Sequence, residues 1–339
     1  MGKRLLKSYI EQPLTSPARI INRLEAVEQF VKNPVVLMET GDILERVYDI
    51  ERLMTRVMYK TATPRDLKSL SLTSLQLPLL KEQLKKLSGS KLIKSLESSI
   101  STLEEISGLV ENAIIDEPPV SVKDGGVIRD GFNEGLDELR HVMTSGKDII
   151  AEIEQREREE TGIKALKIGF NRVFGYYIEV TRSYYDLVPD RYIRKQTLAN
   201  CERFITEELK NAENNILGAK DKALRLEADI FAEVRDFLAT KLQSIQRTAS
   251  AVAAVDVLAS FADVSIKNNY VRPEIAIDGV IDIHDGRHPV VELMLTDEMF
   301  VPNDVYIDTG SSRMSIITGP NMSGTVSYTH LTLPTNSRV

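Results

Sequence analysis

Residues 202–262 form the stretch that most constrains the fold, because they include no proline and only one glycine, Gly218. Their helical pattern predicts roughly forty unbroken helical residues, or about 60 Å of helix. The stretch follows a β-rich region at 164–180, and another helix is predicted before that region, at about 133–160. A long helix out, a small β-rich unit and a long helix back predict a lever that carries a tip.

Residues 1–115 show helical patterning nearly throughout. Ser16 is a suitable N-cap, and Pro17 then stands at the first helical position. Further apolar stripes run through 43–53 and 92–114, and leucines dominate while aromatic residues are few, which favours packed helices over a sheet. The stripe behind Pro17 consists of Ile20, Ile21, Leu24, Val27 and Val31.

Turn residues interrupt this pattern at 116–131, where two prolines and two consecutive glycines stand. The predicted helix at 133–160 comes next and ends in a run of charged residues: Glu152, Glu154, Arg156, Glu157, Arg158, Glu159 and Glu160. A charge run of this kind is typical of a solvated helix face, and we interpret it in that way rather than as a binding surface.

The β-rich region contains two predicted strands, 166–170 and 176–180, with Gly175 at the turn between them. From 164 to 203 the chain has eight bases and four acids, a net charge of +4, whereas the whole chain carries −7 and the remainder therefore −11. The bases are Lys164, Lys167, Arg172, Arg182, Arg191, Arg194, Lys195 and Arg203.

This basic tip on an acidic lever predicts contact with a nucleic-acid phosphate backbone, independent of base identity. The alternative is a solvated hairpin surface with a chance excess of bases. Tyr184, Tyr185 and Tyr192 are interpreted as the small core of the tip rather than as groups that stack on bases.

Other site classes are poorly supported. A single cysteine, Cys201, rules out an intrachain disulfide and a zinc–cysteine cluster, and it is interpreted as a free structural thiol. His284 and His288 flank a turn without a second ligand cluster, so neither a metal site nor a catalytic residue is predicted. No run of 18 apolar residues predicts a membrane span, and Lys7 interrupts any signal-peptide core, so a cytoplasmic chain without a membrane partner is expected.

The last part of the chain predicts strands at 275–283 (a strand or hairpin), 304–307 and 314–318. The last of these leads directly into Gly319-Pro320-Asn321-Met322-Ser323-Gly324, and glycines at this spacing allow backbone N–H groups to surround a phosphate. A P-loop also needs a Lys and a Ser or Thr next, but Thr325 and Val326 stand there. An ordinary strand-to-loop turn is the alternative.

Taken together, these segments resemble the MutS family of DNA mismatch-repair ATPases over about residues 1–324. The helical part is similar in Met1-Gly2-Lys3-Arg4-Leu5-Leu6, Glu11-Gln12-Pro13-Leu14, Tyr48–Leu53, Pro64-Arg65-Asp66-Leu67 and Asp124–Arg129. Three segments resemble the family's clamp: Glu160-Thr161-Gly162-Ile163, Gly175–Val180 and Arg194–Leu198. The start of its ATPase domain looks like Gly286–Glu292 and Thr318–Gly324.

The resemblance implies a mainly α chain, with a long-helix lever and core, an inserted β-rich clamp, and the truncated beginning of an α/β P-loop ATPase domain. The implied divisions are helical core and lever at 1–160, clamp at 161–205, returning core and lever at 206–265, and the start of the ATPase domain at 266–324. Residues 325–339 are expected to be a non-native tail, because Val326–Thr335 can be encoded by a sequence that resembles a transposase-type sequencing adapter read in frame.

The resemblance also implies that the full-length protein clamps double-stranded, mismatched DNA and couples this to ATP and Mg²⁺. It works as a homodimer and recruits a MutL-type repair partner. The implied nucleotide-binding residues are Phe300, which packs near the adenine, and Gly319, Pro320, Asn321, Met322, Ser323 and Gly324, which form the front of the phosphate loop. Without the P-loop lysine, this chain is expected neither to bind ATP and Mg²⁺ productively nor to hydrolyse ATP.

Two other functions remain open. The mismatch reader of the family uses an aromatic residue in a Phe-x-Glu arrangement, and Phe132-Asn133-Glu134 stands in the core segment, where it is not assigned that role. A recombination-type paralogue lacks such a reader. A non-enzymatic DNA-binding scaffold would bind duplex DNA in a salt-dependent way without any effect of ATP.

Overall fold

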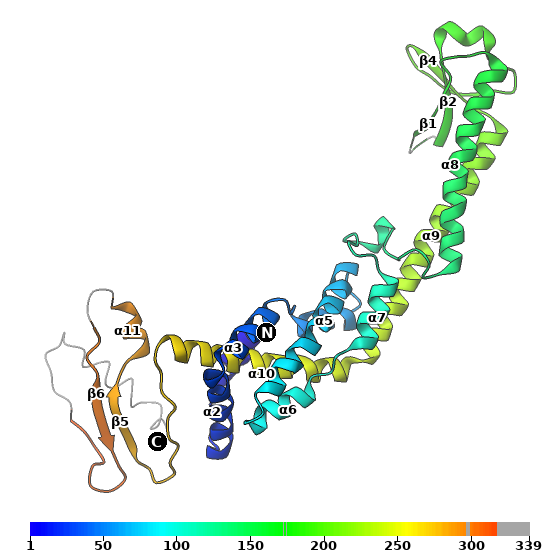
Figure 1. Ribbon diagram of the computed structural model, residues 1–339. Coiled ribbons are helices and arrows are strands. Elements are labelled where there is room, and N and C mark those ends of the chain that lie inside the picture. The colour runs from blue at the N-terminus through cyan, green and yellow to red at the C-terminus, as the bar shows by residue number, and fades with distance from the viewer. Residues whose placement is uncertain (172, 174, 296–298, 317–339) are drawn as a thin grey trace.

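The computed structural model describes residues 1–171, 173, 175–295 and 299–316. The molecule is elongated (Figure 1). Two long helices, here called the lever, extend from a helical body and carry a small sheet at their tip. A second small sheet lies at the opposite end of the molecule. The body helices that precede the lever are α1 (Gly2–Glu11), α2 (Pro17–Lys32), α3 (Pro34–Glu45), α4 (Ile50–Met58), α5 (Pro64–Lys86), α6 (Lys91–Ser99) and α7 (Glu104–Ala113).

Short-range capping sets where several of these helices begin. In α5, the Thr63 hydroxyl accepts the Asp66 N–H at 3.2 Å while the Asp66 carboxylate accepts the Thr63 N–H at 2.9 Å, a reciprocal capping box. Ser16 does stand at the N-cap of α2 before Pro17, but its side chain makes no capping hydrogen bond. The predicted apolar stripes at 43–53 and 92–114 are each divided between two helices, α3 and α4 in one case and α6 and α7 in the other.

Helix α10 (Leu242–Lys267) runs through the body and packs against α1, α2, α3, α4 and α6. An 18-residue window of α10 has a mean hydropathy of 1.6, so by length and composition it could cross a membrane, and no such span was predicted from the sequence. Half of that window is buried inside the body, which is typical of a core helix, and Ile245, Ala249 and Val255 are fully buried there.

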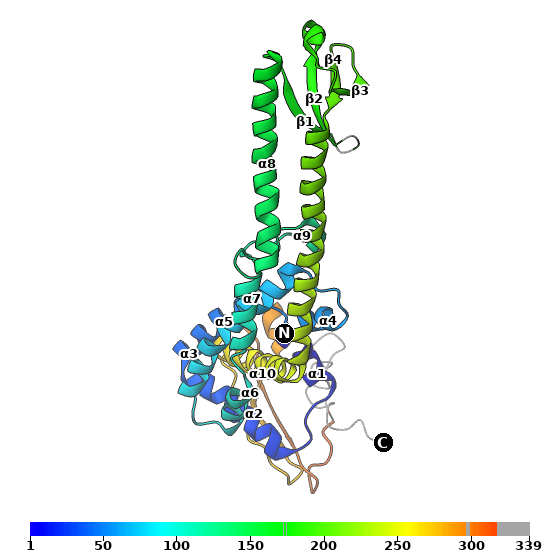
Figure 2. The same cartoon turned by 90° about the vertical axis from the view of Figure 1, so that its right-hand side faces the viewer.

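The lever consists of α8 (Glu134–Thr161) and α9 (Glu207–Thr240), which lie side by side in both ribbon views (Figures 1 and 2). The stretch 202–262 was predicted to contain roughly forty unbroken helical residues, and its longest helix is shorter than that. The stretch begins as a strand, continues as α9 over 34 residues, about 50 Å, and turns at Lys241 into α10. Helix α9 packs mainly against α8, and its lower part also contacts α4 and α7 of the body, whereas α10 packs against the body helices.

The tip is a four-stranded antiparallel sheet in the order β1-β2-β4-β3. Its elements are β1 (Lys167–Asn171), β2 (Gly175–Thr181), the 3₁₀ helix η2 (Arg182–Leu187), β3 (Ile193–Thr197) and β4 (Cys201–Ile205). One face buries Ile178, Val180 and Phe204 in a cluster with Ile150 of α8 and Ile216 of α9. Both predicted strands and the turn at Gly175, with φ of 78°, are confirmed, and Cys201 is the first residue of β4.

The end opposite the tip holds β5 (Ile281–Gly286), α11 (Pro289–Met294) and β6 (Asn303–Ile307). The two strands pair antiparallel, with Ile281 opposite Ile307. The predicted strand at 304–307 is therefore confirmed, and the one at 275–283 begins only at Ile281. Residues 314–316 are not in a strand, and the remainder of that predicted strand lies outside the described residues.

Candidate nucleic-acid interface

The outer face of the tip sheet carries a polar row that crosses all four strands. Lys167 of β1 stands opposite Glu179 of β2, Glu179 opposite Arg203 of β4, and Arg203 opposite Gln196 of β3. Residues opposite one another in an antiparallel pair share a face, and the buried cluster occupies the other face. Arg203 is fixed in this row by the Glu179 carboxylate at 3.2 Å and by the Tyr177 ring, whose centroid lies 4.1 Å from the guanidinium carbon.

The structure separates the predicted tip bases into two groups. Arg191, Arg194 and Arg203 are engaged in ion pairs with glutamates, and Arg194 lies 3.1 Å from the buried Glu202 carboxylate. Four others are exposed and form no ion pair within the described part of the chain: Lys164, Lys167, Arg182 and Lys195. Arg172 lies outside the described residues. From the sequence alone all eight bases are equivalent. Which of them are free of an ion pair depends on the tertiary structure.

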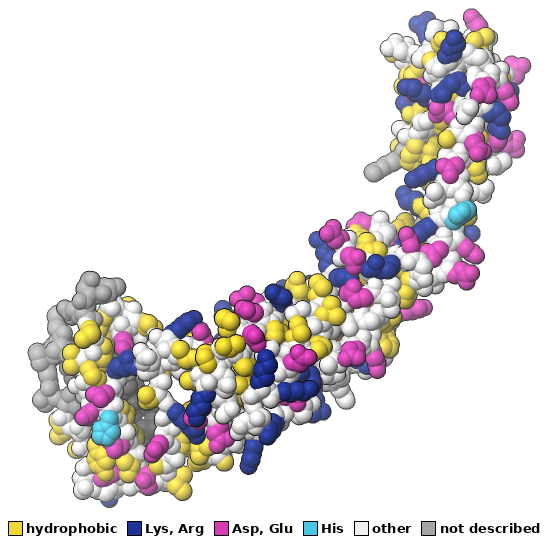
Figure 3. All heavy atoms as spheres, viewed as in Figure 1, with side chains coloured by type: hydrophobic (Ala, Val, Ile, Leu, Met, Phe, Trp, Pro, Cys, Tyr) yellow, Lys and Arg dark blue, Asp and Glu magenta, His cyan; other side chains and the backbone are white. Residues whose placement is uncertain are grey.

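Charge is distributed unevenly around the tip. On the face shown in Figure 3, Lys and Arg side chains lie mostly on the side of the sheet, whereas Asp and Glu lie mostly on the side of α8. On this face, the sheet side of the tip is therefore more basic than the α8 side.

The carboxylate of Glu157 joins the tip to the lever. Glu157 is 3% exposed, and it accepts hydrogen bonds from Arg191 at 2.7 Å and from the Tyr192 hydroxyl at 2.8 Å. Burial and the hydrogen bond to Glu157 raise the pKa of Tyr192 above its ordinary value, so the hydroxyl stays a donor. The interpretation of 152–160 as a solvated face was therefore wrong at Glu157, because the sheet covers that position.

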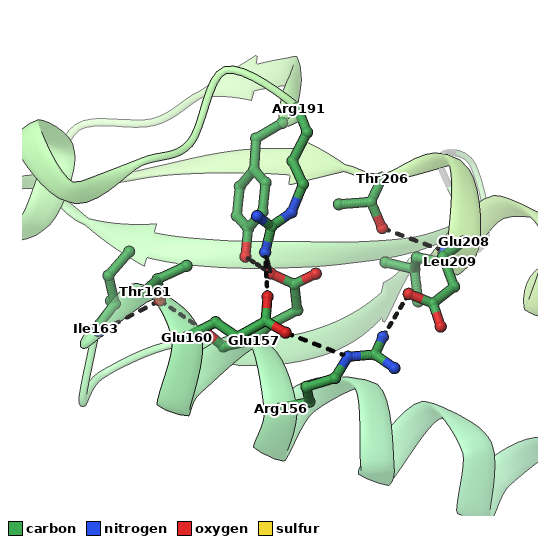
Figure 4. Close-up of polar contacts among 10 residues, drawn as sticks. Arg156, Glu157, Glu160, Thr161, Ile163, Arg191, Thr206, Glu208 and Leu209 are labelled. Atoms are coloured by element: carbon green, nitrogen blue, oxygen red, sulfur yellow. Dashed lines mark hydrogen bonds and ion pairs between the residues drawn. The ribbon is translucent and has the colours of Figure 1, made fainter.

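A chain of ion pairs extends this contact to the start of α9 (Figure 4). Glu160 pairs with Arg191 at 2.8 Å and with Arg156 at 4.0 Å, and Arg156 in turn pairs with Glu208 in the first turn of α9. The N-cap of α9 is Thr206, whose hydroxyl accepts the Leu209 N–H at 3.2 Å. The chain segment before β3, the end of α8 and the beginning of α9 are thus tied together at one level of the molecule.

A second buried carboxylate lies at the base of the lever. Glu227 of α9 is 3% exposed and accepts hydrogen bonds from Arg140 of α8 at 2.6 Å and from the Val127 N–H at 3.2 Å. The loop that contains Val127 includes the 3₁₀ helix η1 (Val122–Asp124) and Gly125, whose φ of 74° favours glycine. The Asp124–Arg129 motif therefore connects the body to the lever, through the hydrogen bond from the Val127 N–H to Glu227 of α9.

The remaining predicted site residues fall into three groups. Phe300 is half-buried, whereas Gly319, Pro320, Asn321, Met322, Ser323 and Gly324 lie outside the described residues. His288 caps α11 by accepting the Val291 N–H at 3.2 Å, and no group of acids, histidines and cysteine suited to a metal ion occurs among the described residues. Burial and the nearby Glu179 charge raise the pKa of the Cys201 thiol, which disfavours its reactive thiolate.

Two contributors to the tip were missed as functional candidates. From the sequence, Tyr177 is only one residue of the Gly175–Val180 motif, whereas in the structure the Arg203 guanidinium lies over its ring. Glu157 was placed on a solvated face, although it is the acceptor that anchors Arg191 and Tyr192. Neither role has a signal in local sequence, because both partners come from elements distant along the chain.

Comparison with known proteins agrees with this architecture. Residues 1–262 match the family described as MutS domain III, a range that includes the lever and the tip. The proteins named DNA mismatch repair protein MutS from Acetivibrio thermocellus, Ruminiclostridium cellulolyticum and Caldicellulosiruptor bescii are each 49% identical to this chain over 328 residues. Each match covers 97% of this chain and 38% of the relative, so the chain spans about two fifths of these relatives' length. The chain belongs to the MutS family of DNA mismatch repair proteins.

Proposed function

We propose that this chain holds duplex DNA by its phosphate backbone through the basic side chains of the tip. The observation that carries the proposal is the set of four exposed tip bases, Lys164, Lys167, Arg182 and Lys195, that form no ion pair within the described residues. Cations that neutralise phosphates release counterions from DNA, which favours binding without regard to sequence. This local charge acts even though the whole chain carries −7.

In the full-length protein, we propose that the lever couples this contact to ATP binding and hydrolysis. Helix α9 descends from the tip and α10 continues through the body toward the segment with β5 and β6 (Figure 1). There, Phe300 would pack near the adenine and residues 319–324 would form the front of the phosphate loop. ATP and Mg²⁺ would serve the complete homodimer, which would recruit a MutL-type partner. With Thr325 and Val326 at the Lys and Ser/Thr positions, this chain itself would not hydrolyse ATP.

Salt-dependent binding of a labelled duplex, followed by fluorescence anisotropy, tests the DNA contact. The double variant Lys167→Gln/Lys195→Gln removes two of the four exposed bases, one on β1 and one on β3. The slope of log affinity against log salt concentration is negative, and each lost phosphate contact makes it less steep by about 0.9. Two lost contacts should therefore reduce the steepness of the slope by about 2. The loss of affinity should be the same for duplexes of unrelated sequence, because phosphate contacts do not read bases.

The matched control is Lys91→Gln/Lys94→Gln, which removes two exposed lysines from α6 in the body. This variant changes the net charge of the chain by the same amount but leaves the tip intact. It should keep the slope of the unaltered chain. Equal losses in the two variants would mean that the tip is not the contact surface and would overturn the proposal.

A further inference from the structure

The buried position of Glu157 demands an explanation, because its neighbours on α8 are solvated. Its side chain is 4% exposed, whereas the side chains of Arg156 and Glu160 are 47% and 51% exposed. Removing a carboxylate from water is costly unless charged or hydrogen-bonding partners replace the water. Among the described residues, the donors to this carboxylate are two consecutive residues, Arg191 and Tyr192, which immediately precede β3.

Strand β3 follows this anchor directly. Like β1 it is an edge strand: among the described strands it pairs with β4 alone, and unlike the β1–β2 pair its pairing is irregular, between Arg194 and Gln196. The irregularity falls at Lys195, one of the exposed bases that form no ion pair within the described residues. An edge strand held through one irregular ladder frays easily, so a fixed point at its start restricts how far Lys195 can move.

The ring of Tyr192 adds an apolar part to the same anchor. It is 7% exposed and packs on Phe204 of β4, with ring centroids 5.8 Å apart. The hydroxyl reaches Glu157 while the ring stays in the cluster under the sheet. We call Glu157, Arg191 and Tyr192 the Glu157 cluster.

We propose that Glu157 is a positioning residue for DNA binding: it fixes the start of β3 on α8, so that Lys195 on this strand is held in one position relative to the other exposed tip bases. The inference rests on the proposed DNA contact. The Glu157 carboxylate points from α8 toward Arg191 and Tyr192 of the tip and does not touch DNA. Its contribution is to remove in advance the conformational entropy that the edge strand would otherwise lose when DNA binds.

Loss of the Glu157 charge and loss of its positioning role change the affinity for DNA in opposite directions. Neutralising a carboxylate near a DNA-binding surface adds one positive unit to the net charge, which by itself strengthens binding. Loss of the fixed point weakens binding. The direction of the change in affinity therefore distinguishes the two roles.

The experiment compares Glu157→Gln, Glu160→Gln and Tyr192→Phe in the whole chain. Glu160→Gln is the matched control, because it neutralises an exposed partner of the same Arg191 and leaves the buried acceptor in place. Duplex affinity should fall about tenfold for Glu157→Gln, since roughly one residue's backbone freedom is regained. It should fall less for Tyr192→Phe, which changes no charge, and should stay equal or rise for Glu160→Gln.

Amide hydrogen exchange supplies a readout that needs no DNA. Residues 193–197 should exchange faster in Glu157→Gln and Tyr192→Phe than in Glu160→Gln, while residues 176–180 of the central strand β2 stay protected. Unchanged exchange in β3 of both cluster variants, or equal affinities of Glu157→Gln and Glu160→Gln for DNA, would overturn the inference. Failure of the unaltered chain to bind duplex in a salt-dependent way would instead overturn the proposed function, and faster exchange in β3 would still establish the anchor.

Discussion

Arg140 of α8 donates a hydrogen bond to the Glu227 carboxylate of α9 at 2.6 Å, and this carboxylate is almost fully buried. The same arginine donates to the Ile128 carbonyl at 2.8 Å and pairs with Asp130. One side chain therefore joins both lever helices to the loop that leaves the body. With Glu157 near the tip, each end of the lever has a buried carboxylate that binds an arginine from another element.

Substituting Glu227 should destabilise the chain strongly. Glu227→Ala leaves the Val127 N–H without its acceptor and Arg140 without its buried partner, and breaking such a pair costs about 3 kcal/mol or more. Urea unfolding followed by helical circular dichroism measures this loss. Glu233→Ala, at an exposed position on the same helix, should change the free energy of unfolding by less than about 0.5 kcal/mol. Equal effects would show that the buried pair does not support the lever.

Two glycines of the lever should respond to alanine in opposite directions. A Cβ on Gly146 of α8 would lie 2.4 Å from Ile216 Cγ1 on α9, so Gly146→Ala forces the helices apart or distorts Ile216. Gly218 has nothing within 4 Å of a Cβ, so Gly218→Ala should stabilise α9 by up to about 1 kcal/mol through helix propensity. Thermal unfolding of both variants measures the difference. A stabilised Gly146→Ala would contradict close packing of α8 on α9.

Acid should weaken the contact between α1 and α4. Arg4 donates to both carboxylate oxygens of Asp49, at 2.6 and 2.8 Å, and this lowers the pKa of Asp49 below its ordinary value of 3.8. The unfolded chain therefore binds more protons than the folded chain in the window just below that value, so stability rises with pH there. The contribution is fully present above about pH 5 and is lost as pH falls through the lowered pKa of the folded state.

The stability difference between the unaltered chain and Asp49→Asn, measured by urea unfolding as a function of pH, tests this. Asparagine remains a good N-cap for α4, so the change mainly removes the charge. The difference should be largest near neutral pH and shrink on acidification. In an Arg4→Gln background it should become smaller and depend less on pH, with the part due to the Arg52 N–H at the helix N-cap remaining. A constant difference in the original background would contradict the role of Arg4.

Local sequence predicted much of the tip and the start of the lever. Asn133 precedes α8 and its side chain accepts the Leu136 N–H at 3.0 Å, so the boundary at 133 follows from residues within one turn. The strands on either side of Gly175 likewise follow from their β-rich composition and a residue able to adopt positive φ. Capping and turn formation act over a few residues, and they can be read from a few residues.

The turn at Lys241 could not be read in this way. Thr240, Lys241 and Leu242 contain neither glycine nor proline, and Leu238 and Ile245 are fully buried on either side of them. Apolar periodicity continues through the junction, because each helix has an apolar face. The face of α9 packs mainly on α8 and, near its end, on α4 and α7, whereas α10 packs on α1, α2, α3, α4 and α6; only the assembled structure reveals this change of partners.

The sequence by itself determined that this chain is mainly helical, that a β-rich unit interrupts the long helices, and that this unit carries the excess of positive charge. These properties depend on composition and short-range periodicity. The tertiary structure decided which of the tip bases remain unpaired and that Glu157 is an interior acceptor. Ion pairing and burial depend on side chains brought together from distant positions, such as Glu157 with Arg191 and Tyr192, and no local pattern contains that information.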